Sequence, residues 1–360
     1  MVSIINPVIA AAFTARSADP APNTPHLQAV TTTHRLTVRP CTFLLAPQGR
    51  AARPCAARLR RLHVTTPKSS PRKGIILAGG TGSRLYPLTI GVSKQLMPVY
   101  DKPMIYFPLS VLMLTGIREI AIITTPEDQA QFQRALGDGS QWGIVLTWIE
   151  QPAPEGLAQA YILAEKFLDG APSTMVLGDN IFFGHGLTDL LTEAEAQREG
   201  ATVFGYRVAD PERYGVVSFD GAGNVTGIVE KPEKPQSQYA VSGLYFMDAS
   251  APQRARSVTP SARGELEITT LLESYLLEGK LNVQKMGRGF AWFDTGTHAS
   301  LLDAGNFVRT LQTRQSTLVG SPDEIAFENG WLDRAALQER ARRFEKSDYG
   351  AALLRLDDAD

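Results

Sequence analysis

From residue 72 onward, short apolar runs alternate with longer segments in which apolar residues recur at a helical period. The runs have the length of buried strands, and the periodic segments have the length of helices that cover a sheet. In the first part of this region the expected strands are 74–78, 119–124, 144–149 and 174–177, and the expected helices are 104–115, 126–136 and 157–168. This alternation predicts an α/β fold with a Rossmann-like, doubly wound, mostly parallel sheet.

Strands become more frequent after residue 200. The expected strands there are 202–208, 215–219, 225–230, 241–247 and 282–286, and the expected helices lie near 266–277, 298–312 and 337–344. Right-handed crossovers put the carboxyl ends of parallel strands on one rim, where open α/β sheets bind ligands. We therefore expect one domain over residues 72–360, with halves at 72–200 and 201–300 and a helical C-terminal part at 301–360.

Residues 1–71 differ in composition and are rich in Ala, Pro, Thr and Arg. Their prolines interrupt any long helix, and Asp19 is their single acid. We therefore expect a disordered basic leader. Such a composition is typical of an organelle transit peptide, and a misplaced start codon is the alternative. The first would place the protein in an organelle and the second in the cytoplasm.

Composition argues against several classes of protein. No apolar run approaches the roughly 20 residues that a membrane span needs, so we expect no membrane partner. Both cysteines, Cys41 and Cys55, lie in the leader, so the rest of the chain has no disulfide, cysteine nucleophile or thiolate zinc site. The total charge is −1, and nine basic residues against one acid give residues 1–70 about +8, which leaves about −9 for the remainder. This net negative charge after residue 70 argues against nucleic acid as a partner, because proteins that bind nucleic acid usually have a basic surface.

A glycine-rich turn directly follows the first expected strand. Gly79, Gly80 and Gly82 allow backbone N–H groups to approach phosphate oxygens, and Arg84 and Lys94 follow as cations. Two unit charges of the same sign about 4 Å apart repel by roughly 4 kcal/mol at an effective dielectric near 20, so a site that joins two phosphates needs such cations. The turn is neither a Walker loop nor a full dinucleotide-binding motif.

Further motifs follow in a fixed order and cover residues 72–350. They are GIILAGGTGSRL (74–85), SKQLMP (93–98), DKPMIY (101–106), LGDGSQWG (136–143), QPAPEGLAQA (151–160), VLGDN (176–180), DPERYGVV (210–217), EKP (230–232), YAVSGLY (239–245), SARGELEIT (261–269) and WFDTGT (292–297). In these motifs the chain resembles the glucose-1-phosphate thymidylyltransferases, a family of sugar nucleotidylyltransferases. The resemblance implies Mg²⁺-dependent formation of dTDP-glucose and pyrophosphate from dTTP and glucose 1-phosphate, the first step of dTDP-rhamnose and deoxysugar biosynthesis.

The resemblance also implies roles for particular residues. Asp179 and Asp294 would hold the catalytic Mg²⁺, which prefers carboxylate and phosphate oxygens, and Arg84, Lys94 and Lys231 would be the catalytic cations. The nucleotide would lie in residues 72–200 and contact Leu77, Gly79, Gly80, Gly82, Ser83, Arg84, Lys94, Gln151, Gly156 and Asp179. The sugar phosphate would lie mainly in residues 201–300 and contact Asn180, Tyr214, Gly215, Glu230, Lys231 and Val241.

The implied mechanism is an in-line displacement, in which the phosphate of glucose 1-phosphate attacks the α-phosphorus of dTTP. Family members are typically homotetramers that dTDP-rhamnose inhibits at a separate site, so we expect both properties. His185 and His298 flank the two acids, but Mg²⁺ favours oxygen ligands and we do not expect them to bind it. Ser83 and Thr270 depart from the family pattern of Thr and Asp, and neither departure removes an assigned residue.

Three alternatives stay open. Related enzymes of this architecture use UTP, ATP or GTP, and a difference of one methyl group in a pocket discriminates only about 10- to 200-fold. A catalytically inactive regulatory or scaffold subunit is the second alternative, and a metal-dependent glycosyltransferase is the third. The presence of Arg84, Lys94, Asp179, Lys231 and Asp294 favours an active nucleotidylyltransferase.

Overall fold

Parallel strands form the first part of the central sheet. The computed structural model describes residues 70–80 and 82–356, so the expected leader lies outside the described residues except for 70 and 71. β1 (Lys73–Ala78) lies between β4 (Glu119–Thr124) and β6 (Ser173–Leu177), and β5 (Val145–Glu150) follows β4 at the edge. All of these pairs are parallel. The four strands predicted for this part are confirmed.

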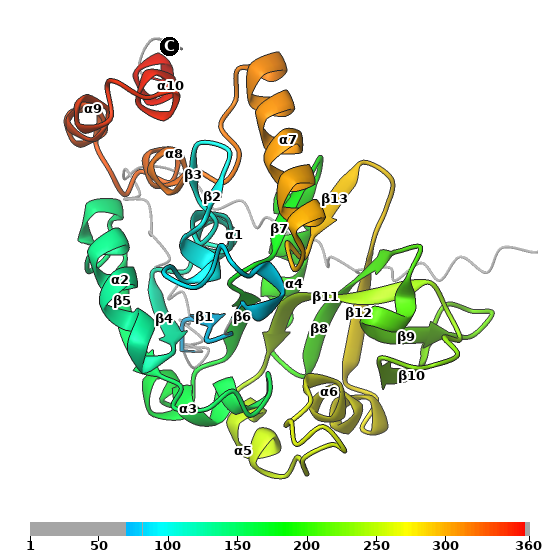
Figure 1. The fold of residues 1–360 in the computed structure, drawn as a ribbon. Helices are drawn as coiled ribbons and strands as arrows, with labels where there is room; N and C mark the ends of the chain where they lie inside the picture. The colour runs from blue at the N-terminus through cyan, green and yellow to red at the C-terminus, as the bar shows by residue number, and fades with distance from the viewer. Residues whose placement is uncertain (1–69, 81, 357–360) are drawn as a thin grey trace, which may run out of the picture. The chain divides into compact units, whose positions relative to one another are not determined.

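Helices cover both faces of this sheet (Figure 1). In β1, Ile76 and Ala78 belong to one core cluster and Ile75 and Leu77 to another, because successive side chains of a strand point to opposite faces. The face of Ile76 is covered by α1 (Tyr106–Leu114), α2 (Pro126–Leu136) and α4 (Leu187–Ala196). The face of Ile75 is covered by α3 (Gln159–Leu168), α5 (Ala251–Arg256) and α6 (Ile268–Leu277). The doubly wound arrangement is thereby confirmed.

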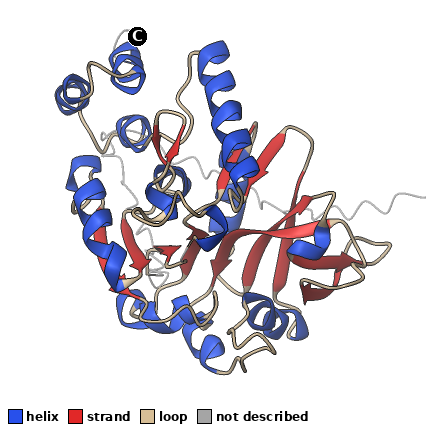
Figure 2. Cartoon of the chain, viewed as in Figure 1, coloured by secondary structure: helices blue, strands red, loops and turns tan. Residues whose placement is uncertain are grey.

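The second part of the sheet is mostly antiparallel and surrounds one long strand. β11 (Tyr239–Met247) pairs antiparallel with β6, β8 (Ala201–Arg207) and β9 (Gly215–Phe219). β10 (Val225–Glu230) pairs antiparallel with β9, and β12 (Leu281–Met286) runs parallel to β8. Among the described residues these strands join the first four in one nine-stranded mixed sheet (Figure 2).

Two pairs of short strands lie outside this sheet, and the hydrophobic pattern did not predict them. β7 (Ile181–Gly184) pairs with β13 (Phe290–Phe293), and β2 (Pro98–Val99) pairs with β3 (Lys102–Pro103). Three helices begin two residues later than predicted, α1 at Tyr106, α3 at Gln159 and α6 at Ile268. Before α6 the backbone of Glu267 is still extended. The first of these strand pairs positions a site residue, as described below.

Helices make up the C-terminal part, as predicted. They are α7 (His298–Gln315), α8 (Pro322–Glu328), α9 (Arg334–Arg343) and α10 (Asp348–Leu356). The carboxylate of Asp323 on α8 accepts hydrogen bonds from Nε of Arg340, at 2.6 Å, and from the hydroxyl of Tyr349, at 2.7 Å, so a buried polar contact ties the last three helices together. In the part of the chain that the structure describes, no helix is both long and apolar enough to span a bilayer.

Candidate functional site

The ends of β1 and β6 bring the glycine-rich turn and the first acid to one rim of the sheet. Leu77 and Leu177 are paired in the parallel register, and the N–H of Gly178 donates to the carbonyl of Leu77 at 2.9 Å. The glycine-rich turn therefore begins beside Asp179. Gly82 has a φ of +62°, a left-handed conformation that favours glycine.

The second acid reaches the same place through the pairing of β7 with β13. Phe293 lies opposite Ile181 in this antiparallel register, so Asp294 follows one strand just where Asn180 precedes the other. The hydroxyl of Thr295 then donates to the backbone carbonyl of Asp179 at 2.6 Å. Thr295 is fully buried with a φ of +38°, a strained conformation for a β-branched residue. The fold thus holds a costly backbone geometry next to the two acids.

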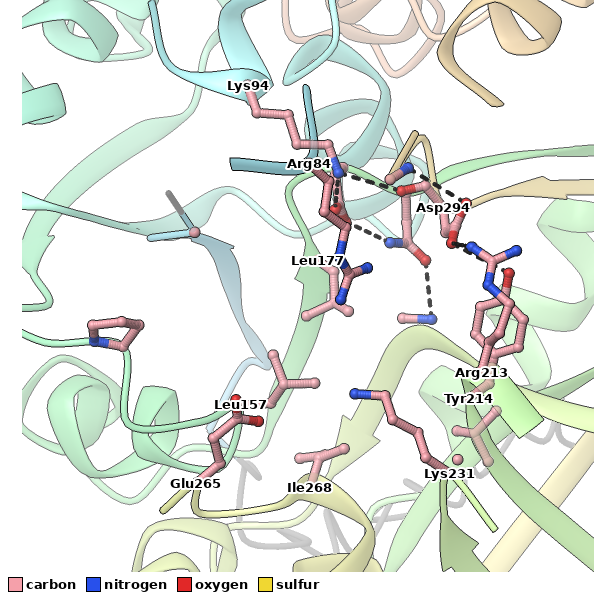
Figure 3. A pocket seen from close by; sticks show the side chains of 18 of the residues that line it. Arg84, Lys94, Leu157, Leu177, Arg213, Tyr214, Lys231, Glu265, Ile268 and Asp294 are labelled. Atoms are coloured by element: carbon pink, nitrogen blue, oxygen red, sulfur yellow. Dashed lines mark hydrogen bonds and ion pairs between the residues drawn. The ribbon is translucent and has the colours of Figure 1, made fainter. Parts of the chain in front are cut away.

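Cations of the chain are bonded to both acids (Figure 3). Nζ of Lys94 lies 2.5 Å from Oδ2 of Asp179 and 3.5 Å from the carbonyl oxygen of Asp294. Oδ2 of Asp294 accepts from Nη2 of Arg213 at 3.4 Å and from the hydroxyl of Tyr214 at 3.2 Å. Burial and the nearby Asp294 charge raise the pKa of Tyr214 to about 12, so its hydroxyl keeps its proton and remains a donor at neutral pH.

These two acids fit a divalent cation with few protein ligands. Within the described residues no group of three or more His, Cys, Asp or Glu side chains could hold a metal ion. Mg²⁺ is commonly bound through one or two carboxylates together with phosphate oxygens of the substrate. Asp179 and Asp294 supply two carboxylates at one cavity, and both now contact cations that a metal ion would replace. The donor set therefore suits a metal ion that a nucleotide helps to bind.

Asn180 orients the first acid. Its Nδ2 donates to Oδ1 of Asp179 at 2.7 Å, and its Oδ1 accepts from Nε1 of Trp292 at 2.6 Å and from the N–H of Gly243 at 3.1 Å. A Cβ at position 243 would lie 2.6 Å from this oxygen, so glycine is required there. Protein groups thus use the oxygen of Asn180 twice and one N–H of its amide, and its predicted contact with the sugar phosphate stays a prediction.

A second group of charged residues lies at the end of the β9–β10 hairpin. Glu230 is paired with Gly215, and the N–H of Lys231 donates to the carbonyl of Tyr214 at 3.0 Å. Lys231 has a φ of +40°, and its Nζ lies 3.4 Å from Oε1 of Glu230. Arg263 contacts the same Oε1 at 3.3 Å. This end of the larger cavity therefore offers a carboxylate for hydroxyl groups and one cation, Lys231, for an anion, whereas Arg263 lines neither cavity and is paired with Glu230, Glu265 and Glu267.

The loop over residues 155–158 is held by backbone pairing. The N–H of Leu266 donates to the carbonyl of Glu155 at 2.7 Å, and the N–H of Ala158 donates to the carbonyl of Leu266 at 3.0 Å. Gly156, between them, has a φ of +107°, and a Cβ there would lie 2.5 Å from backbone atoms of Leu266. Only glycine lets these two segments approach this closely.

Two adjoining cavities collect the predicted residues. The larger, of about 540 Å³, is lined by Gly80, Gly82, Ser83, Arg84, Lys94, Asp179, Asn180, Tyr214, Gly215, Glu230, Lys231, Val241 and Asp294 among others. The smaller, of about 230 Å³, is lined by Leu77, Gly79, Gly80, Gln151, Gly156 and Asp179 among others. Every site residue predicted from the sequence therefore lines one of the two cavities. His185 and His298 are exposed and line neither cavity.

The charges of the larger cavity balance. Its lining contains four cations, Arg84, Lys94, Arg213 and Lys231, and four acids, Asp179, Glu230, Glu265 and Asp294. A divalent cation would make this lining positive and so complementary to phosphate groups. Arg84 makes no ion pair among the described residues and extends into the cavity (Figure 3).

Several residues of the site were not predicted. Arg213 and Trp292 lie within the motifs that carry the resemblance, but their partners are more than 30 positions away along the chain. Gln159, which bonds Gln151, was also missed. The presence of Arg213 next to Tyr214, inside a motif that supplies site residues, is the signal that could have identified it.

Comparisons with known proteins agree with this geometry. The nucleotidyl transferase family model matches residues 73–310. Over 285 residues, 79% of this chain and 97% of the relative, the chain is 60% identical to a glucose-1-phosphate thymidylyltransferase of Xanthomonas campestris pv. campestris strain B100. It is 57% identical to the Neisseria gonorrhoeae protein of that name over 284 residues, 79% of this chain and 99% of the relative. A crystal structure from Bacillus anthracis, described as such an enzyme in complex with a sucrose, is similar with a TM-score of 0.62 and 42% identity, over 66% of this chain and 95% of that chain.

Proposed function

Because this chain belongs to the nucleotidyl transferase family, we propose that it transfers a thymidylyl group from dTTP to glucose 1-phosphate and releases pyrophosphate. Relatives that carry the name of this activity are 57% and 60% identical over almost their whole length. The observation that carries the proposal is the cavity itself, where a glycine-rich turn, four cations and two paired acids adjoin a smaller cavity lined by Gln151. Two phosphorylated substrates can meet there.

The side chains act by positioning and by charge compensation. The phosphate of glucose 1-phosphate is a dianion at neutral pH, since the second pKa of a phosphate monoester is about 6, so it needs no general base to attack. Lys231, which lines the larger cavity, holds this phosphate. Arg84 and Lys94 contact the phosphates of dTTP and stabilise the charge of the leaving pyrophosphate. Glu230 and Tyr214 accept hydrogen bonds from sugar hydroxyls.

Asp179 and Asp294 would hold Mg²⁺ on the nucleotide, with Asn180 fixing the position of Asp179. When bound, the ion supplies positive charge that offsets the charge developing on the phosphates. With the ion bound, Lys94 would lose its contact with Asp179 and become available to phosphate oxygens, whereas Arg213 would keep its ion pair with Asp210. The chain thus exchanges internal ion pairs for contacts with the substrates.

A pyrophosphate-release assay tests this activity. The enzyme is incubated with Mg²⁺, glucose 1-phosphate and one of dTTP, UTP, ATP or GTP, and the sugar nucleotide formed is identified by mass. We expect the highest kcat/KM with dTTP, and measurable turnover with UTP because the two bases differ by one methyl group. Preference for ATP or GTP would contradict the base assignment. Absence of pyrophosphate release with all four nucleotides would favour an inactive subunit. Transfer of sugar to an acceptor would favour a glycosyltransferase.

We also propose the properties that accompany this activity in the resembling family. These are a homotetramer, inhibition by dTDP-rhamnose, and a cytoplasmic location unless residues 1–71 act as a transit peptide. Light scattering checks the subunit number, and titration of turnover with dTDP-rhamnose checks inhibition. N-terminal sequencing of the native protein shows whether the leader is retained.

A further inference from the structure

The two side-chain amides next to the smaller cavity are hydrogen-bonded to each other. Nε2 of Gln151 donates to Oε1 of Gln159 at 2.6 Å, and both residues are buried, with exposed fractions of 4% and 8%. Gln151 directly follows the last residue of β5 and lines the smaller cavity. Gln159 is the first residue of α3 and does not line this cavity. A side-chain amide can rotate by 180° and exchange its donor and acceptor sides. Some further contact must therefore determine that Gln151 donates and Gln159 accepts.

Glu155 fixes the direction. Its backbone N–H donates to Oε1 of Gln159 at 3.3 Å, and its carboxylate Oε2 accepts from Nε2 of Gln159 at 2.8 Å. A backbone N–H can only donate and an ionised carboxylate can only accept, so both contacts require the same orientation of Gln159. The backbone of Glu155 is in turn held by its bond to Leu266. Gln159 must therefore present its oxygen to Gln151.

This orientation decides what Gln151 offers to a ligand. Because its Nε2 donates to Gln159, Oε1 remains on the side of Gly79, where a Cβ at position 79 would clash with it. No donor in the described part of the chain bonds this oxygen. The cavity therefore presents a free acceptor, Oε1 of Gln151, next to the second N–H of the same amide.

Pyrimidine bases differ in the pattern that meets such an amide. Thymine and uracil place an N3–H donor next to the O4 acceptor, whereas cytosine places an N3 acceptor next to an N4 amino donor. A freely rotating amide matches either edge, because it can turn over. A fixed amide matches one and leaves the other with two facing acceptors and two facing donors, which is costly in a buried site.

We propose that Gln159, oriented by Glu155, is a positioning residue that locks the amide of Gln151 and makes the base cavity select thymine or uracil against cytosine. This inference rests on the proposed function, because it takes the smaller cavity as the base site of a pyrimidine nucleotide. Gln159 acts through Gln151 and makes no contact with the base. The lock rejects cytosine and leaves the choice between thymine and uracil to the contacts of the C5 methyl group.

Binding of dTTP, dUTP and dCTP in the presence of Mg²⁺, measured by isothermal titration, tests the lock without requiring turnover. We expect the wild-type protein to bind dTTP at least about 100-fold more tightly than dCTP, since a site built to hydrogen-bond a ligand rejects a mismatched one strongly. Gln159→Leu removes the lock and should lower the dTTP:dCTP affinity ratio by about tenfold or more. The dTTP:dUTP ratio should not change, because both bases present the same edge.

Two further variants sharpen the test. Gln159→Lys supplies only donors, so it should bond Glu155 and Oε1 of Gln151, turn the Gln151 amide over and lower the dTTP:dCTP ratio further than Gln159→Leu. Glu155→Gln changes an exposed side chain, so we expect this variant to keep the fold. It should lower the dTTP:dCTP ratio by a few-fold, because the side chain at position 155 can then donate as well as accept and no longer fixes the orientation of Gln159. Gln133→Leu on α2, outside both cavities, is the matched control and should bind as the wild type does.

The dTTP:dCTP affinity ratio distinguishes loss of the fixed amide orientation from a general loss of nucleotide binding. A variant that merely distorts the loop would weaken dTTP and dCTP equally, and an unchanged dTTP:dCTP ratio in Gln159→Leu and Glu155→Gln would overturn the proposal. Failure of the proposed function has another signature, namely selective dTTP binding in wild type with no pyrophosphate released in the presence of glucose 1-phosphate. A wild-type protein that binds dCTP as well as dTTP would overturn the lock and leave the transferase activity to its own assay.

Discussion

At the scale of single residues, Arg213 and a metal ion compete for one carboxylate. The guanidinium contacts Asp294 and also Asp210, at 2.6 Å, and lies over the ring of Tyr214. Its pKa is raised, first by the hydrogen bond to Asp210, so it is always charged. Replacing it by glutamine frees Asp294, and we expect Mg²⁺ or Mn²⁺ to bind about two- to fivefold more tightly, which is the value of an exposed ion pair.

Electron paramagnetic resonance of Mn²⁺ with dTTP measures this binding directly. Arg207→Gln is the matched control, because Arg207 is an exposed arginine that bonds Gln238 and lines neither cavity. Weaker metal binding in Arg213→Gln would mean that the arginine orients Asp294 for the metal and does not compete with it.

Arg84 has no ion-pair partner among the described residues, so its removal should lower the catalytic rate and leave the stability of the fold unchanged. The side chain lines the larger cavity and makes no ion pair in the described residues. By analogy with arginines that stabilise phosphoryl-transfer transition states, we expect Arg84→Ala to lower kcat by on the order of 10³-fold. Single-turnover kinetics with saturating dTTP measure the effect, and thermal unfolding should be unchanged. Turnover within a few-fold of wild type would remove Arg84 from the mechanism.

The residues found from the sequence have a signal in their own neighbourhood. Arg84 and Lys94 follow a glycine-rich turn, and Asp179 follows a buried strand, so spacing and the resemblance were sufficient. Arg213 and Gln159 gain their meaning from the atoms they face, which lie 81 and 8 positions away. The order of residue types along the chain does not reveal these contacts. They form only because the register of distant strands and the start of α3 bring the partners together.

At the scale of elements, the pairing of residues 155–158 with Leu266 connects the two cavities. Glu265, next to Leu266, lines both of them. A Cβ at Gly156 would lie 2.5 Å from Leu266, at a φ of +107° that other residues resist. We expect Gly156→Ala to push the two segments apart and raise the KM for dTTP by more than about tenfold, with a smaller change in kcat.

Steady-state kinetics with each substrate varied in turn measure this effect. Gly221→Ala is a suitable control, since a Cβ there meets no atom within 4 Å and its backbone is not in the left-handed region. An unchanged KM for dTTP in Gly156→Ala would show that the loop tolerates displacement and that backbone pairing does not position it.

Elements with strong periodicity were predictable, and short ones were not. β1, β4 and β6 each contain a short apolar run, and their burial on both faces is typical of parallel strands. β7 and β13 have four residues each and pair across more than 100 positions, so no local pattern marks them. α4, α5, α8 and α10 were not predicted, and none of them is longer than ten residues.

At the scale of the whole molecule, the C-terminal helices contain an acid that should make stability depend on pH. Burial first, and then the charge of Glu328, raise the pKa of Glu324 from its ordinary 4.5 to about 8. Below the lower value both states are protonated and stability is unaffected. As pH rises from 4.5 through about 8 the unfolded chain releases its proton more readily than the folded one, so stability is lost.

Glu324→Gln should remove this loss. We expect the variant to exceed the wild type by up to about 5 kcal/mol in free energy of unfolding at pH 9, and to match it near pH 4.5. Denaturant titrations at the two pH values measure the difference. Glu339→Gln, an exposed change on α9, is the control and should be neutral at both. Equal gains at pH 4.5 and pH 9 would contradict the titration of Glu324.

The strand pair β7–β13 also has a consequence for the synthesis of the protein. The cavities draw on residues from Leu77 to Gly296, and the second acid arrives only after β13 has found a partner that was translated more than 100 residues earlier. A nascent chain on the ribosome therefore carries the phosphate-binding turn long before it can couple two substrates. Copies that terminate early cannot consume dTTP, so an interrupted message yields inert protein and no partial enzyme.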